Sequence, residues 1–221
     1  MSTSKAMTED QQLRESVVRE LEWEHQITSK EIDVAVHNHI VTFSGCVYGY
    51  SEKLAAEKAA KRVYSVKDVL NHLEVKPGLV MPDTELAREA RQALQRNLSV
   101  PDTRIEVTVR NGEISLEGDV DWHFQKEGAE EAVRDLAGVK SVLNRLVVRA
   151  TVPARDVRSK IEEALRRRAD LDPRRIAVLT HNSTVELRGN VRSWAEKDEV
   201  AAVAWAAPGV TEVENHIVVV P

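Results

Sequence analysis

The sequence predicts an α+β protein of three tandem α-β-β-α-β domains, each a three-stranded mixed sheet with two helices on one face. The first observation behind this is an internal repeat. Residues 13 to 75 match later residues without gaps after a shift of 73 positions, and again after a further shift of 71. The second is hydrophobic spacing that switches from helical to alternating within each copy. The copies span 8–76, 81–149 and 152–220.

Each copy begins with a predicted helix, followed by a hairpin. From Leu86 to Leu94 the apolar residues recur every fourth position, which places them on one helical stripe. Residues 105–110 then alternate between apolar and polar, as a half-buried strand does. The pair Asn111-Gly112 favours a type I′ turn, in which both central residues take positive φ. Asn38 and Asn182 hold the matching positions, so we expect a hairpin in every copy.

The second strand of each copy ends at a recurring glycine, namely Gly45, Gly118 or Gly189. One interpretation is structural: the glycine supplies unusual backbone angles or lets another segment pack closely. The other is that bare backbone receives a ligand there. We favour the structural interpretation because no phosphate-binding glycine pattern is present.

A second helix and a third strand complete each copy. Gly138 and Gly209 are placed to cap the end of this helix. Ser65 replaces that glycine in the first copy, so its helix should end less sharply. A helix between the second and third strands implies a parallel, right-handed crossover with both helices on one face. The connectors at 76–82 and 150–153 are short and contain proline, so we expect the copies to touch.

The other face of the sheet is predicted to differ among copies. In the third copy the outward positions include four apolar residues, and an exposed apolar sheet invites association. We therefore predict that another copy or a second chain covers this face, which makes the third domain a candidate for homo-oligomer formation. The candidate assembly residues are Ala177, Leu179, Val218 and Val220.

The element order, the glycine that ends the second strand and the Gly-Val-x-x-Val-x-Asn run at 138–144 and 209–215 resemble the BON domain. This family is named from bacterial osmotically inducible and nodulation-associated proteins. The resemblance implies a non-enzymatic protein that binds an anionic phospholipid surface, a partner protein or both, within a stress response. The alternative it implies is a potassium or small-ligand sensor, as in a cytoplasmic relative that carries a LysM domain. It implies no catalytic residues.

Two groups of residues are candidates for lipid or partner binding. Trp122 and Trp194 follow the second strand in two copies, and they form either an interfacial patch or caps on small cores. We favour the caps, and we expect Trp23 and Trp205 to be packing residues. The other group is basic and is either a lipid-binding patch or a solvated helix end near Asp170 and Asp172. It comprises Arg166, Arg167, Arg168, Arg174 and Arg175.

Composition and motifs argue against several function classes. The net charge of −5 disfavours sequence-independent nucleic-acid binding, which depends on phosphate neutralisation by clustered cations. His37 and His39 flank a predicted turn, and no residue is spaced to complete a metal site. Cys46 is the single cysteine, and the sequence has no nucleophile motif, so we expect a protein that is not an enzyme and has no cofactor. The amino terminus lacks a signal-peptide pattern, so we expect a cytoplasmic protein with no transmembrane segment.

Overall fold

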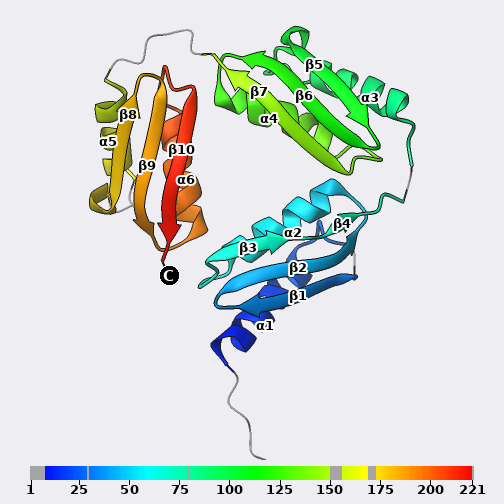
Figure 1. The fold of residues 1–221 in the computed structure, drawn as a ribbon, viewed down its shortest axis with the longest axis horizontal. Helices are drawn as coiled ribbons and strands as arrows, with labels where there is room; N and C mark the ends of the chain where they lie inside the picture. Colours follow the sequence, from blue (N-terminus) through cyan, green and yellow to red (C-terminus); the bar gives the residue numbers. More distant parts are fainter. Residues whose placement is uncertain (1–7, 29, 79, 150–155, 169–172, 221) are drawn as a thin grey trace, which may run out of the picture.

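A computed structural model describes residues 8–28, 30–78, 80–149, 156–168 and 173–220. It confirms the predicted α+β class, with three α-β-β-α-β units along the chain (Figure 1). Each unit has its own cluster of buried apolar residues, formed between one face of a sheet and its two helices. The connector at 150–153, predicted to be short and stiff, lies outside the described residues.

The elements repeat in the same order three times. The first repeat contains α1 (Glu9–Trp23), β1 (Ile32–His37), β2 (Ile40–Val47), α2 (Tyr50–Arg62), β3 (Asp68–Asn71) and β4 (Glu74–Val75). The second contains α3 (Asp83–Arg96), the 3-10 turn η1 (Asp102–Arg104), β5 (Ile105–Arg110), β6 (Glu113–Val120), α4 (His123–Arg134) and β7 (Ser141–Val148). The third contains α5 (Val157–Arg166), η2 (Pro173–Arg175), β8 (Ile176–His181), β9 (Thr184–Val191), α6 (Trp194–Trp205) and β10 (Glu212–Val219).

The sheets are mixed, as the crossover helix requires. β1 pairs antiparallel with β2, and β3 and β4 both pair parallel with β2 as two parts of one interrupted strand. The second sheet has the order β5-β6-β7 and the third β10-β9-β8, again with one antiparallel and one parallel pairing. The middle strand of each unit is therefore the second one, and the first strand lies at an edge.

The predicted hairpin turns have the backbone that the asparagines favour. Asn38, Asn111 and Asn182 take φ of 52°, 53° and 55°. In the second repeat the Asp83 carboxylate accepts hydrogen bonds from the backbone N–H groups of Asn111 (2.7 Å) and Gly112 (3.0 Å). Asp10 does the same for the first turn, at 2.9 and 3.1 Å. These backbone hydrogen bonds lower the pKa of Asp10 and tie the first helix to the hairpin.

The second helices end as predicted in two repeats and differently from our expectation in the first. Gly138 and Gly209 take positive φ of 88° and 91° after α4 and α6. The expectation that α2 ends less sharply is wrong, because Ser65 adopts the same left-handed backbone with φ of 70°. The first repeat therefore keeps the turn at the cost of strain that a glycine would avoid.

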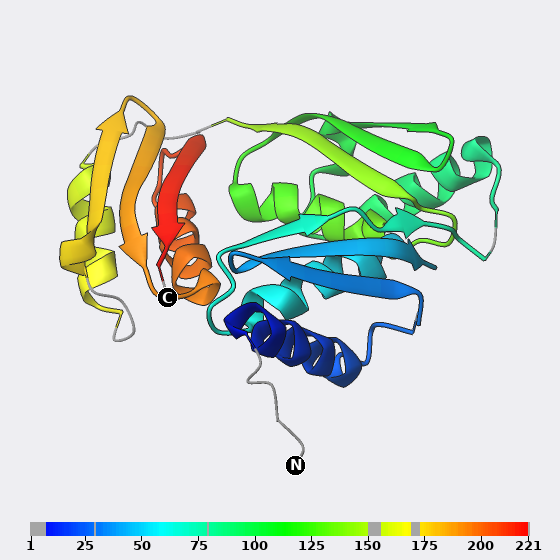
Figure 2. The same cartoon turned by 60° about the horizontal axis from the view of Figure 1, so that its bottom comes forward.

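The three second helices, α2, α4 and α6, lie around the centre of the molecule (Figures 1 and 2), and side-chain contacts join each to the next. Their first residues occupy equivalent positions, and each reaches the next repeat. Tyr50 packs against the core of the second repeat, close enough to Arg134 for its charge to act on the hydroxyl. His123 stacks on Trp205 of the third repeat with ring centroids 3.7 Å apart.

The third of these contacts closes a ring of repeats. The Lys61 ammonium group, from the end of α2, lies 4.5 Å from the centroid of the Trp194 ring. Lys61, Arg134 and Trp205 occupy equivalent positions in their helices, so the start of each second helix meets the end of the next. The three contacts therefore use the same two surfaces each time, as heterologous contacts do when they form a closed ring.

Two of the four tryptophans were expected to be packing residues, and one is not. Trp205 packs against the cores of both the second and the third repeat, as expected. Trp23 is 84% exposed, so that expectation is wrong. Leu13, Val17 and Leu21 form the buried stripe of α1, and a residue two positions after Leu21 points away from it.

Candidate functional site

A groove of about 590 Å³ runs between α5 and the edge strand β8 of the third repeat. It brings together two of the predicted arginines and two of the predicted assembly residues, which the sequence analysis had assigned to separate surfaces. Apolar side chains from both elements line it between charged ones. The lining residues are Arg158, Glu162, Leu165, Arg166, Arg174, Ile176, Ala177, Val178 and Leu179.

The spacing of residues in α5 explains this arrangement. Val157, Ile161 and Leu165 are four apart and buried in the core of the repeat. Arg158 and Arg166 each follow a member of that stripe by one position, so they lie along its margin, beside β8. The outer edge of β8 has no neighbouring strand among the described residues. Its side chains differ in burial, with Val178 buried and Ala177 exposed.

The predicted arginine cluster is divided by the structure. Arg167 forms an ion pair with Glu163 (3.1 Å), and Arg168 forms one with Glu199 of α6 (2.7 Å). Both therefore lie among carboxylates, away from the groove. In the described part of the chain no carboxylate lies within 4.0 Å of the Arg166 guanidinium group. Arg166 and Arg174 are the members of the cluster that line the groove, and Arg175 is exposed beside it.

The two candidate tryptophans do not form a common patch. Trp194 is partly buried against the core of its repeat, and the Lys197 ammonium group lies 5.0 Å from its ring centroid. Trp122 is 37% exposed and lines a different cavity, between α4 and α6. A role of either ring in lipid or partner binding stays a prediction.

The recurring glycines and asparagines have identifiable structural roles. Gly118 has a φ of 132°, and a Cβ atom on it would lie 2.1 Å from the backbone oxygen of Arg104. Gly45 and Gly189 are equally confined, by Glu31 and Arg175. The structural interpretation of these glycines therefore accounts for their recurrence.

The recurring asparagines join the third strand to the second helix. The Asn144 side chain donates a hydrogen bond to the backbone oxygen of Lys126 in α4 (2.7 Å), and Asn71 donates one to Lys53 in α2 (2.8 Å). The sequence pattern showed that these residues recur but not what they bond.

The family model of the BON domain matches residues 9–77, 82–150 and 154–221. The chain belongs to the BON family. The chain is 34% identical over 126 residues to "Osmotically-inducible protein Y" of Escherichia coli (strain K12). That alignment covers 54% of this chain and 63% of the relative, so the chain spans less than two thirds of it.

Among solved structures, the chain is similar to the C-terminal domain of CdsD, "the structural protein of the Type III secretion system of Chlamydia trachomatis". The identity is 14%, the match covers 93% of this chain and 98% of that one, and the TM-score is 0.24. A second structure of CdsD matches at 14% identity with a TM-score of 0.23, covering 93% and 92%. TM-scores this low do not establish a shared arrangement of the three repeats.

The open sheet face of the third BON repeat is more polar than the sequence analysis recognised. Val218 and Val220 are 56% and 46% exposed, and no other repeat covers them. The middle strand β9 separates Val218 from Ala177 and Leu179 on β8. Val218 is paired with Asn190, whereas Ala177 and Leu179 are paired with Arg188 and Glu186. The four residues thus lie at two opposite edges of the face. Their role in assembly stays a prediction.

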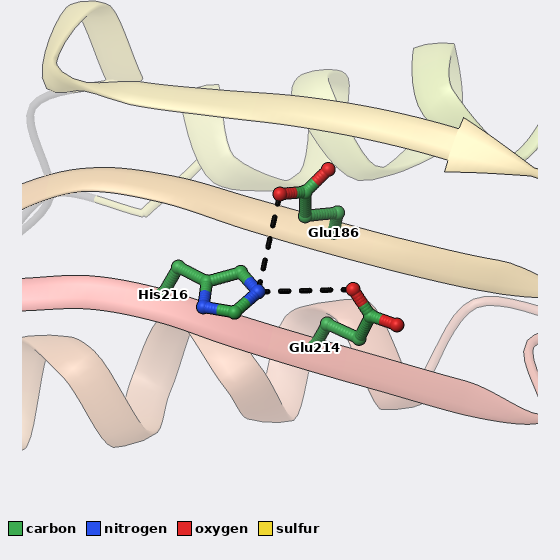
Figure 3. A group of neighbouring side chains, drawn as sticks. All are labelled: Glu186, Glu214 and His216. Carbon is green, nitrogen blue, oxygen red and sulfur yellow. Dashed lines mark ion pairs between the residues drawn. The ribbon is translucent and has the colours of Figure 1, made fainter.

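Three side chains on this face converge closely enough to be considered for a metal ion. The His216 Nε2 atom lies 3.7 Å from Glu214 Oε2 and 3.9 Å from Glu186 Oε1 (Figure 3). Two carboxylates and an imidazole are ligands that Zn²⁺ accepts. Arg188 already forms an ion pair with Glu186, however, so ion pairing accounts for the cluster without a metal. Sequence reasoning missed it because the two glutamates are adjacent only through the pairing of β9 with β10.

Proposed function

We propose that this protein is a non-enzymatic component of an osmotic-stress response that binds anionic phospholipid surfaces through the groove between α5 and β8. The observation that carries the proposal is the combination in one groove of Arg166 and Arg174 with an apolar floor that includes Leu179. Guanidinium groups bind phosphate well, and apolar side chains accommodate the adjoining hydrocarbon. The similarity to an osmotically inducible protein supports the stress role.

The proposed binding is to the surface of a membrane. Of the described helices, none combines the length and the apolar character needed to cross a bilayer. Near an anionic membrane each arginine contributes about 1 kcal/mol of attraction, which salt screens. The cytoplasmic location stays a prediction.

Flotation of the full chain with vesicles tests the proposal. Vesicles of phosphatidylglycerol should carry the protein at low salt, vesicles of phosphatidylcholine should not, and binding should fall as salt is raised. The double variant R166Q/R174Q should weaken binding about 30-fold, the factor that about 2 kcal/mol gives. The matched control R91Q/R96Q removes two exposed arginines from α3, the equivalent helix of the second repeat.

Two results would contradict the proposal. One is equal flotation with both lipids. The other is equal loss of binding in the two double variants, because net charge alone would then explain it. The sensor alternative makes a different prediction, namely a higher melting temperature in potassium than in sodium chloride at equal ionic strength.

A further inference from the structure

A second cavity, of about 670 Å³, lies between the second and third BON repeats. The first turn of α4 and the C-terminal half of α6 form it, and aromatic rings provide much of its wall. The rings are those of Trp122, Phe124 and Trp205. Two alanines of α6 and Ala206, directly after it, complete the apolar lining. This volume is within the range of about 300 to 1,000 Å³ that is typical of small-molecule sites, which often lie at domain interfaces.

The contacts between repeats do not require these aromatic residues. All three contacts follow the same rule, but the positions equivalent to Trp122 and Phe124 are Gly49 and Ser51 in the first repeat. In the third repeat they are Ser193 and Ala195. Two of the contacts are therefore made with small residues where the third has two large rings. Trp122 and Phe124 also remain 37% and 55% exposed, so a substantial part of each side chain is not covered by the contact.

The charges that line the cavity are all negative. Glu127 and Asp198 supply the two carboxylates, and the lining contains no lysine or arginine. Burial and the nearby Glu131 and Glu130 raise the pKa of Glu127, while the charge of Lys58 opposes this shift. Burial lowers the pKa of His123 to about 4, so its ring is neutral at pH 7 and adds no positive charge.

We propose that this cavity binds a small organic cation with a methylated ammonium group. Tryptophan gives the strongest attraction for a cation placed over its ring. The Trp122 ring lines the cavity, and the Trp205 ring has one face left for a cation because His123 stacks on the other. Methyl groups suit the alanine-lined wall, because they are apolar and spread the charge. A bare ammonium or metal ion would lose its hydration shell and regain only two carboxylates. The proposal is independent of the lipid-binding groove, which lies between α5 and β8.

Titration of the full chain with choline chloride tests this inference, with tryptophan fluorescence and amide NMR shifts as readouts. We expect saturable shifts at the start of α4 and the end of α6. The neutral analogue 3,3-dimethylbutan-1-ol has the same shape without the charge, and ammonium chloride has the charge without the methyl groups. Both should fail to saturate the site. D198N should weaken choline binding by several-fold.

The double variant W122S/F124A provides the sharpest test. It introduces the residues that the third repeat already has at these positions, so the contact between repeats should be kept. We expect it to weaken choline binding at least about tenfold. The control W23S removes a tryptophan that is 84% exposed and distant from the cavity, and it should bind choline as the parent does.

Several outcomes would overturn the inference. They are the absence of saturable shifts with choline, equal binding of the neutral analogue, and unchanged affinity in W122S/F124A. Equal binding of Nα-acetyl-lysine amide would identify a protein side chain as the occupant. Flotation with phosphatidylcholine vesicles, without binding of free choline, would identify a lipid surface. Failure of R166Q/R174Q to affect lipid binding would leave this inference standing.

Discussion

Replacing Lys61 and Trp194 tests whether the third repeat is held against the first. The Lys61 ammonium group lies 4.5 Å from the Trp194 ring centroid, and the lysine side chain is 27% exposed. A partly desolvated cation over tryptophan contributes about 1 kcal/mol. We therefore expect a coupling free energy of about 1 kcal/mol between K61M and W194L in a double-mutant cycle.

The assay is urea unfolding of the parent, both single variants and the double variant. Lys61 also forms an ion pair with Glu57 (2.7 Å), and the ammonium group of Lys197 lies near the same tryptophan ring. Each of these contacts is lost along a single arm of the cycle, so it cancels from the coupling free energy. A coupling below about 0.3 kcal/mol would refute the contact, because unconnected residues differ from additivity by about that much.

A control cycle uses a tryptophan that does not contact Lys61. Trp23 is 84% exposed at the end of α1, so K61M and W23L should be additive. Coupling in this control as large as that with Trp194 would show that the effect comes from the charge of Lys61 in general and not from the ring contact.

Three further substitutions address stability. G118A should lower the free energy of unfolding by more than about 3 kcal/mol in urea titrations, since its Cβ would clash with backbone, whereas G78A, with no atom within 4 Å, should change it little. S65G should raise the free energy of unfolding by about 1 kcal/mol, and with it the melting temperature, because glycine adopts the left-handed backbone of position 65 without strain. An unchanged melting temperature would refute the strain. Burial holds the pKa of His123 at about 4, against 6.5 in the unfolded chain, so protonation favours unfolding as pH falls through this interval. Stability should decline by about 1 to 2 kcal/mol between these values, after allowance for partial exposure, and H123F should remove that part of the decline.

The fold could be predicted because the backbone preferences and hydrophobic spacing that determine it act over a few residues and are repeated in three copies. Asparagine and glycine, as at 111 and 112, favour positive φ from their own chemistry. The apolar residues from Leu86 to Leu94 form a helical stripe because of their spacing alone. Repetition strengthened each inference, because a pattern found at three positions is not accidental. Ser65 was misjudged because side-chain preference alone was considered, while the surrounding strand and helix determine its backbone.

The candidate sites were harder to predict because they depend on which side chains meet. The arginines at 166–168 are consecutive in sequence, but α5 ends at Arg166, and of the three only Arg166 lines the groove. The groove joins it to Leu179, which the sequence analysis had placed on another surface.

By itself, the sequence determined the three BON repeats, the order of their elements and the turns between strands, since hydrophobic periodicity and backbone preference act over a few residues. Only the tertiary structure decided that the second helices meet end to start, that Glu186 lies beside Glu214, and that Trp122 and Trp205 line one cavity. These contacts join residues tens of positions apart. They arise from the packing of whole repeats, which no short sequence pattern records.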